Sequence, residues 1–236
     1  MAPPTKIKMC FLLDCTYSME PWIVAAKRQV AAIVNRTLDE YPNVVFNVAF
    51  VGYRDFGDTT PFVSVPFTSN IQSFLSQIDG IHSEGGGDIA EDVAGGLTHV
   101  ADLNWGDADI RVLVHIADAP AHGNQFHGPN ISDRFPQNDF GLLENVGRLI
   151  VAGIDYTFIR TNRDTDIMTN KFIHEYGHCP ERTFVLLDLE GQEPPNTALL
   201  AEVDISHGER LFASEVTRTL SQAVSRHTSS QYPEAD

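Results

Sequence analysis

Short apolar runs alternate with helical apolar stripes along most of this 236-residue chain, and no other feature limits the fold as strongly. Five of the runs have the length and composition of strands that are covered on both faces. They occupy residues 7–13, 44–51, 112–117, 154–159 and 184–187. Segments whose apolar residues recur every three or four positions separate them, as buried helix faces require. The alternation predicts an α/β, doubly wound, mostly parallel sheet with helices on both faces.

One further run, at residues 62–67, alternates apolar and polar positions and contains Pro66. Because proline cannot donate a hydrogen bond to a neighbouring strand, we expect this run to be one antiparallel edge strand. Ser69 or Asn70 is expected to cap the helix that follows it. The pattern contains no internal repeat and no interdomain linker. It therefore predicts a single domain over residues 1–228 and a frayed polar tail over residues 229–236.

The formal net charge of −16 disfavours nucleic acid or an anionic membrane surface as a partner. No apolar run is long enough to span a bilayer, and the first residues do not resemble a secretory signal. The three cysteines, Cys10, Cys15 and Cys179, are too few for a disulfide framework and fit a reducing compartment. These features favour a cytoplasmic location, and they leave the oligomeric state open.

Polar residues follow two of the predicted strands and a glycine-rich loop. Asp14, Thr16 and Ser18 come after the first run, Asp88 follows three glycines at 85–87, and Asp118 ends the run at 112–117. In a doubly wound sheet, ligands bind at the carboxyl ends of the strands, so these groups are expected to meet there. Carboxylates and hydroxyls are hard oxygen donors that suit Mg²⁺ or Ca²⁺, and also Mn²⁺.

Each cluster also has a simpler explanation when it is taken alone. Asp14 with its following hydroxyls could cap a helix, and Asp118 before Pro120 could form a strand-ending turn. An unpartnered carboxylate at the end of a buried apolar run would be costly, however. Because both aspartates occupy such a position at one sheet edge, we favour a divalent-metal site.

The spacing Asp14-x-Thr16-x-Ser18 resembles the first motif of the metal-ion-dependent adhesion site (MIDAS) of von Willebrand factor A (vWA) domains. Four pieces in the same order look most like the vWA domains attached to fungal and amoebal alpha-kinases. These pieces are Asp14–Met19, Tyr53–Asp55, Gly85–Asp88 with Glu91–Val93, and Ala117–Pro120. The resemblance covers nearly the whole chain. It implies that Asp14, Thr16, Ser18 and Asp118 bind the metal, directly or through water.

The sequence departs from the better-known adhesion domains at the second loop, where those domains place a threonine on the metal. This chain offers Asp88 at that place. Three ionised carboxylates around a 2+ ion would leave the site net negative. We therefore expect tight metal binding, a weak attraction for acidic ligands, and a preference for ligands that coordinate through neutral or hydroxyl oxygens. Asp88 would bind directly or through water.

Other side chains on or beside these loops are candidates for contacting the ligand. They are Tyr17, Glu20, Arg54, Asp55 and His122. Arg54 and Asp55 are expected either to form an ion pair close to the metal or to belong to an exposed turn.

The remaining histidines have simpler expectations. His115 lies within a strand and is expected to be a core histidine. His122 and His127 belong to the long polar stretch 122–139, where they are expected either to contact a bound partner or simply to be exposed on the loop. His174, His178 and Cys179 lack the second pair of ligands that a common zinc site requires.

Three functions follow from these residues. The first is a non-enzymatic binding module in which a partner protein, or another ligand, supplies an oxygen to the metal. The second is a metal-dependent phosphohydrolase with Asp14 as nucleophile. Such enzymes usually carry a second aspartate two residues on, where this chain has Thr16, and no lysine is placed to stabilise a phosphoryl group. The third is a scaffold that has lost its metal, against which the intact first motif argues. We favour the binding module.

Overall fold

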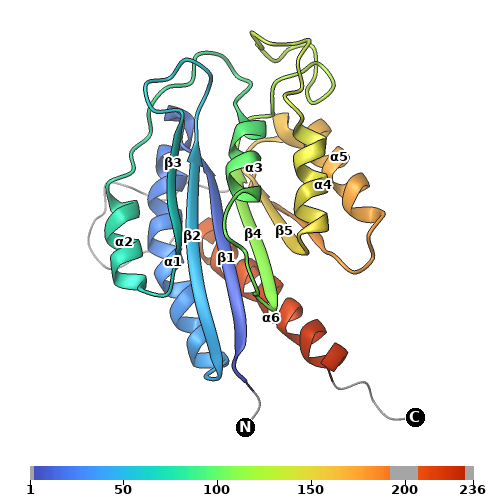
Figure 1. Ribbon diagram of the computed structural model, residues 1–236. Helices are drawn as coiled ribbons and strands as arrows, with labels where there is room; N and C mark the ends of the chain where they lie inside the picture. The colour runs from blue at the N-terminus through green and yellow to red at the C-terminus, as the bar shows by residue number, and fades with distance from the viewer. Residues whose placement is uncertain (1–2, 192–206, 232–236) are drawn as a thin grey trace.

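The computed structural model describes residues 3–191 and 207–231, with the side chains of residues 207–212 and 228–231 outside the description. A six-stranded sheet forms its centre, in the order β3-β2-β1-β4-β5-β6 (Figure 1). The strands are β1 (Thr5–Asp14), β2 (Val44–Tyr53), β3 (Phe62–Thr68), β4 (Ile110–Ala117), β5 (Ile154–Arg160) and β6 (Phe184–Asp188). All neighbours pair in parallel except β2 and β3, which are antiparallel. The predicted fold class and the proline-containing edge strand are confirmed.

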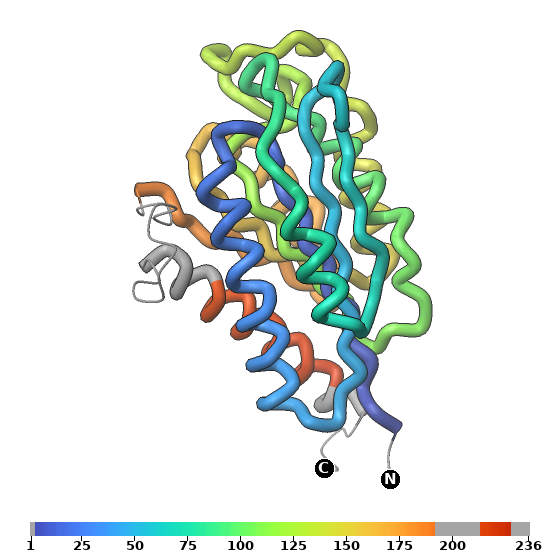
Figure 2. The backbone as a smooth tube through the Cα atoms, turned by 90° about the vertical axis from the view of Figure 1, so that its left-hand side faces the viewer, coloured from blue at the N-terminus to red at the C-terminus, as the bar shows by residue number. Residues whose placement is uncertain are grey.

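Two layers of helices enclose the sheet (Figures 1 and 2). One layer contains α1 (Glu20–Glu40), α2 (Ile71–Asp79) and α6 (His207–Gln231), and the other contains α3 (Val93–Ala101), α4 (Leu142–Val151) and α5 (Asp166–Gly177). Successive residues of β1 point to opposite layers, so Phe11 and Leu13 belong to one core while Cys10 and Leu12 belong to the other. Burial on both faces explains why the strands are continuous apolar runs.

The helix ends follow from local chemistry. Pro21 lies in the first turn of α1, where its missing N–H leaves no hydrogen bond unmade. The side chain of Asn70 accepts a hydrogen bond from the Ser73 N–H, which identifies Asn70 as the cap of α2. Asp92 caps α3 in the same way by accepting from the Gly95 N–H at 2.7 Å.

The chain winds outward from β1 to β2 and β3, and then returns to the other side of β1 to form β4. Leu13 of β1 lies in register with Ile116 of β4, so the two central strands end at the same level. The loops that follow them lead to opposite helix layers, because α1 and α4 belong to different cores. A crevice opens between such loops at the point where the winding direction reverses.

Helix α6 packs beside α1 (Figure 2). Val216, Leu220 and Val224 are buried in the core that α6 shares with α1. The helix continues to Gln231, which extends into the 229–236 segment that was expected to be a frayed tail. Within the described residues, none of the helices combines the length and apolar character needed to cross a membrane.

Candidate metal centre

Asp14 ends β1 and is fully buried at the crevice between β1 and β4. Its Oδ1 accepts two hydrogen bonds from Thr16, one from the backbone N–H at 2.9 Å and one from the hydroxyl at 2.7 Å. Its Oδ2 has no hydrogen-bond partner among the described residues. Burial, together with the neighbouring Asp118 carboxylate, raises the pKa of Asp14 to about 7. One oxygen is thus held in place by Thr16, and the other is left for a positive group.

The other predicted ligands of the first and fourth strands lie at the same place. The Thr16 hydroxyl is 3.3 Å from the hydroxyl of Ser18. Asp118 follows β4 directly, and its Oδ1 is also buried without a hydrogen-bond partner in the described structure. Burial raises the pKa of Asp118, a rise that the Ser18 side chain opposes. Asp14, Thr16, Ser18 and Asp118 therefore converge as the sequence pattern requires.

Glu91 is a further acid at this place that the sequence reasoning did not select as a ligand. It is 3% exposed, and its Oε2 has no hydrogen-bond partner in the described part of the chain. Burial and the carboxylates of Asp14, Asp55, Asp58 and Asp118 raise its pKa to about 11. The sequence carries no signal that separates Glu91 from its neighbouring acids Asp88 and Asp92.

Glycines let the second loop approach the first. Gly85 has φ +81°, and a Cβ there would lie 2.0 Å from Oδ2 of Asp58. Neither the conformation nor the space accepts a side chain. The loop is also held by hydrogen bonds from the Glu84 N–H to the Cys15 carbonyl and from the Glu91 N–H to the Pro120 carbonyl. The glycines thus help to position Glu91 at the metal centre. The sequence had predicted that the same loop would place Asp88 there.

Asp88 lies at the rim of the same cavity, with a different set of neighbours. Its Oδ2 accepts a hydrogen bond from the Arg134 N–H at 2.6 Å, and its Oδ1 is 3.5 Å from Nε of Arg134. Burial and the facing carboxyl group of Asp55 raise its pKa. Asp55 and His122 are prominent among the charges that perturb Asp88, whereas Asp14 and Asp118 are prominent among those that perturb Glu91. Asp88 is electrostatically part of the group around Asp55.

An open cavity of about 370 Å³ connects these residues to solvent. Among the residues that line it, only Tyr17 and Ile89 are large, exposed apolar or aromatic groups, at 67% and 42% exposure. The polar lining includes Ser18, Asp118 and Asp164, and contains neither lysine nor arginine. The cavity is therefore negative at its floor and suited to a cation.

The two expectations for Arg54 and Asp55 are corrected, because both side chains are buried and they do not pair with each other. Arg54 donates hydrogen bonds to the carbonyls of Cys15, Thr60 and His82, and so ties together three loops of the site. The Oδ1 of Asp55 lies 2.8 Å from Nε2 of His122.

The expected exposure of His122 and His127 is also corrected. They are 2% and 6% exposed, and both contact Asp133. The stretch 122–139 folds back over its own histidines, which polar composition alone did not reveal.

The outer candidates have simpler surroundings. Glu20 is exposed at the start of α1 and accepts a hydrogen bond from the Ser83 hydroxyl. His115 is buried between the hydroxyls of Tyr53 and Tyr156, as expected for a core histidine.

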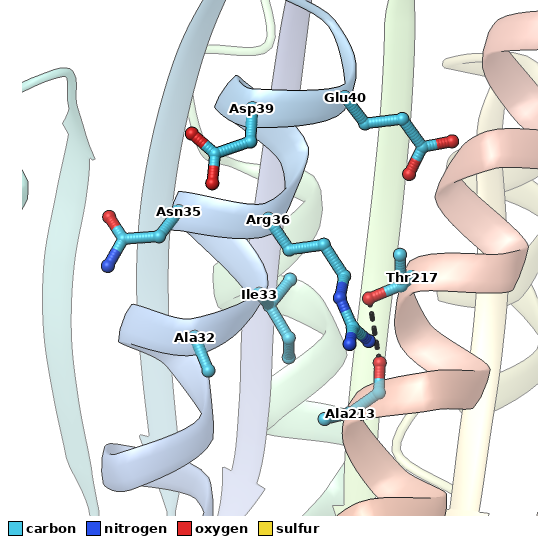
Figure 3. A pocket seen from close by; sticks show the side chains of 8 residues that line it. All are labelled: Ala32, Ile33, Asn35, Arg36, Asp39, Glu40, Ala213 and Thr217. Carbon is cyan, nitrogen blue, oxygen red and sulfur yellow. Dashed lines mark hydrogen bonds between the residues drawn. The ribbon is translucent and has the colours of Figure 1, made fainter.

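A larger hollow of about 600 Å³ lies away from this centre, between α1 and α6 (Figure 3). Figure 3 shows the Arg36 side chain extending toward α6, where the Thr217 hydroxyl donates to the Ala213 carbonyl. None of the residues that line this hollow has a buried polar atom without a partner. Nothing in this hollow therefore calls for a bound ligand, in contrast to the unpaired carboxylate oxygens of the metal centre.

The chain belongs to the von Willebrand factor A domain family, whose model matches residues 8–128. Domains of this family are typically protein-interaction modules and not enzymes. The chain is 29% identical over 171 residues to the alpha-protein kinase vwkA of Dictyostelium discoideum. This match covers 70% of the chain and 27% of the relative. It is 27% identical over 129 residues to a putative ariadne-like RING finger protein of Acanthamoeba polyphaga mimivirus, over 55% of this chain and 12% of that protein. The chain thus spans only a minor part of either relative.

Solved structures show the same fold at low sequence identity. The VWA domain of SpRpn10 matches with a TM-score of 0.53 and 13% identity, over 78% of this chain and 89% of that one. The PilB minor pilin of Streptococcus sanguinis matches with a TM-score of 0.58 and 10% identity, over 94% and 63% of the two chains. The pilus adhesin SpaC of Lactobacillus rhamnosus GG matches with a TM-score of 0.54 and 13% identity, over 93% and 30%.

Proposed function

We propose that this domain is a non-enzymatic binding module whose partner, a protein, donates an oxygen to one divalent cation. Asp14, Thr16, Ser18 and Asp118 hold the cation, directly or through water. Glu91 supplies the acid of the second loop, the place for which the sequence alone favoured Asp88. The donor set consists of carboxylate and hydroxyl oxygens, which suit Mg²⁺ or Ca²⁺ and also accept Mn²⁺.

The observation that carries this proposal is that three carboxylate oxygens are buried and receive no hydrogen bond from the described residues. They are Oδ2 of Asp14, Oδ1 of Asp118 and Oε2 of Glu91. Buried polar atoms are normally paired, because an unpaired one costs roughly 1–3 kcal/mol, and a charged one costs more. A divalent cation in the crevice would offset the repulsion that the carboxylates of Asp14, Asp118 and Glu91 exert on one another. Protons alone would leave three acids crowded at one crevice.

The charge of the centre sets the kind of ligand. Three acids around a 2+ ion leave the site net negative, whether the third acid is Glu91 or Asp88. An incoming carboxylate would meet this charge and that of Asp164 at the cavity wall. A partner that offers a backbone carbonyl, an amide or a hydroxyl oxygen avoids the repulsion. Tyr17 and Ile89 provide exposed surface beside the cavity for such a partner to cover.

The phosphohydrolase alternative gains no support from the centre. One oxygen of Asp14 already accepts two hydrogen bonds from Thr16, and the residues that line the cavity include no cation for a phosphoryl group. Turnover of a generic phosphate ester that disappears in Asp14→Ala would favour that alternative.

Thermal unfolding with added Mg²⁺, Ca²⁺ or Mn²⁺ tests the proposal. A ligand that binds only the folded state at a hundred times its Kd stabilises the fold by roughly 2.7 kcal/mol. We expect a rise in Tm for the wild-type chain, and no rise with Mg²⁺ or Ca²⁺ for Asp14→Ala. Asp39→Ala, which removes an exposed acid of α1, is the control and keeps the full response. A wild-type Tm that none of the three ions changes would refute metal binding at this centre.

A partner search in the presence of metal or of a chelator then tests the second half of the proposal. Proteins that are retained by the wild-type chain with metal, and lost with chelator or with Asp14→Ala, are the expected result. Partners that bind equally well in chelator would show that the metal does not mediate the interaction.

A further inference from the structure

A second group of buried acids surrounds His122, beside the first centre but sharing none of its four motif residues. Asp55, Asp88 and Asp133 are its carboxylates, and their side chains are 1%, 3% and 2% exposed. Ligand atoms of Asp88, His122 and Asp133 all lie within 4.8 Å of one another. Asp55, Asp88 and Asp133 come from three separate loops, which the fold brings together. Burying their charge costs free energy unless a partner compensates for it.

Asp55 and Asp88 each have one buried oxygen without a hydrogen-bond partner among the described residues. The carboxyl groups of Asp55 and Asp88 lie within hydrogen-bond reach of each other. Yet Oδ2 of Asp55 and Oδ1 of Asp88 are both buried without a donor in the described structure. Two carboxylates at this separation repel each other unless a proton or a cation lies between them.

The histidine beside them is already held as a metal-binding imidazole would be. Its Nδ1 lies 2.7 Å from Oδ1 of Asp133, while its Nε2 points to Asp55 at 2.8 Å. Histidines that ligate a metal almost always give their other ring N–H to a carboxylate or carbonyl, which fixes the ring. The rings of Phe56 and Phe135 also pack against it, with centroids 5.2 Å away in each case.

Asp133 fits the role of that outer carboxylate better than the role of a ligand. Its two oxygens accept hydrogen bonds from His122, from His127 and from the N–H groups of Gly123 and Phe135. These four hydrogen bonds use the lone pairs that a metal would need. Asp55 and Asp88, in contrast, each keep one oxygen without a hydrogen bond among the described residues, and that of Asp88 lies 3.5 Å from Nε of Arg134.

We propose that Asp55, Asp88 and Nε2 of His122 form a second divalent-cation site, with Asp133 as the carboxylate that orients the histidine. Two carboxylates and one imidazole suit Mn²⁺ or Zn²⁺ better than Mg²⁺ or Ca²⁺. The ion takes the place of the proton between Nε2 and Asp55, and this proton is released to solvent. Asp88 lines the open cavity, so the ion can enter on that side. The proposal does not depend on metal binding at Asp14.

Counting bound Mn²⁺ by equilibrium dialysis, together with pulsed electron paramagnetic resonance for nitrogen coupled to the ion, tests the second site. We expect two ions in the wild-type chain, one of them coupled to nitrogen. Asp14→Asn should keep the nitrogen-coupled ion and lose the other. Asp88→Asn should lose the nitrogen-coupled ion and keep the other. Asp88→Asn also leaves both His122 contacts intact, so it tests the site without removing the histidine from the fold.

The outcomes separate this proposal from the function proposed above. One bound ion without nitrogen coupling, lost in Asp14→Asn and kept in Asp88→Asn, would overturn the second site and leave the first standing. One nitrogen-coupled ion that survives Asp14→Asn and disappears in Asp88→Asn would do the reverse. Nitrogen coupling that persists in Asp88→Asn would assign the signal to another histidine and also overturn the second site.

Discussion

Thr16 donates two hydrogen bonds to one oxygen of Asp14, from its backbone N–H at 2.9 Å and from its hydroxyl at 2.7 Å. Both donors go to Oδ1, so Oδ2 has no hydrogen-bond partner among the described residues. The hydroxyl proton is directed at Asp14, and the hydroxyl lone pairs remain available for a cation. One residue thus orients the carboxylate and serves as a candidate ligand beside it.

This double role predicts a clear difference between two substitutions. Thr16→Val removes the hydroxyl but keeps the shape and the backbone hydrogen bond. Metal affinity should fall by at least about tenfold, because a ligand and the orientation of a second are both lost. Thr16→Ser keeps the hydroxyl and should bind metal like the wild type. Isothermal titration with Mg²⁺ and Ca²⁺ measures both, and equal affinities for the valine and serine variants would contradict the prediction.

Glu91→Gln should separate the stability of the metal-free fold from its response to metal. The metal-free fold must protonate Glu91, whose pKa is raised to about 11, whereas an amide is neutral in both states, so the metal-free protein should be stabilised by on the order of 3 kcal/mol at pH 7. The rise in Tm on adding metal should become smaller, because a negative ligand is lost. Chemical denaturation with and without metal measures both quantities.

Asp92→Asn is the matched control for this experiment. It neutralises the adjacent buried acid, which caps α3, and asparagine caps a helix as well as aspartate does. Its metal response should equal that of the wild type. A Glu91→Gln protein with an unchanged metal response would remove Glu91 from the ligand set.

Arg54→Lys should destabilise the loops of the metal centre. The guanidinium reaches the carbonyls of Cys15, Thr60 and His82 together, which a single ammonium group cannot do. Losing two such hydrogen bonds should lower the free energy of unfolding by about 2–4 kcal/mol. Arg36→Lys, on the exposed side of α1, should change it little. Equal stabilities of the two variants, measured by urea denaturation, would show that Arg54 does not hold the loops.

His115 should make the fold sensitive to acid. Burial lowers its pKa to about 3, whereas an unfolded histidine titrates near roughly 6.5. Between these two pKa values, His115 is protonated in the unfolded chain and neutral in the folded chain. The contribution of His115 to stability is therefore complete above pH 6.5 and declines as the pH falls toward 3, by on the order of 5 kcal/mol in total.

The measurement is the free energy of unfolding as a function of pH for the wild type and for His115→Gln. Glutamine can still hydrogen-bond with the hydroxyls of Tyr53 and Tyr156 but does not titrate. The variant should be less stable at pH 7 and should lose less stability between pH 6.5 and 4. Parallel curves for the two proteins would show that His115 is not responsible.

The sheet and helices could be predicted because their signals are local. The runs that form β1 and β4 are apolar throughout since both faces are covered, and Pro66 identified the edge strand. The convergence of Asp14 and Asp118 followed from strand ends alone, because parallel neighbours end at one edge. No knowledge of loop shape was needed for these two residues.

The second loop could not be predicted in this way, since distant contacts decide which acid it presents. Ile89 and Ala90 donate their N–H groups to the Ser132 carbonyl, and Glu91 donates to Pro120. These bonds turn Glu91 inward and place Asp88 next to Arg134. The burial of His122 likewise depends on how the 122–139 stretch folds over it, which composition does not encode.

The reversal of winding beside β1 has a mechanical consequence. Asp14 ends the strand from which the chain runs outward through α1, β2 and β3, whereas Asp118 follows the strand that begins the outward run on the opposite side. A cation bound by both residues would link the two halves of the sheet. Binding of the cation would tighten the packing of helices on opposite faces together, and its release would loosen that packing, at positions far from the crevice.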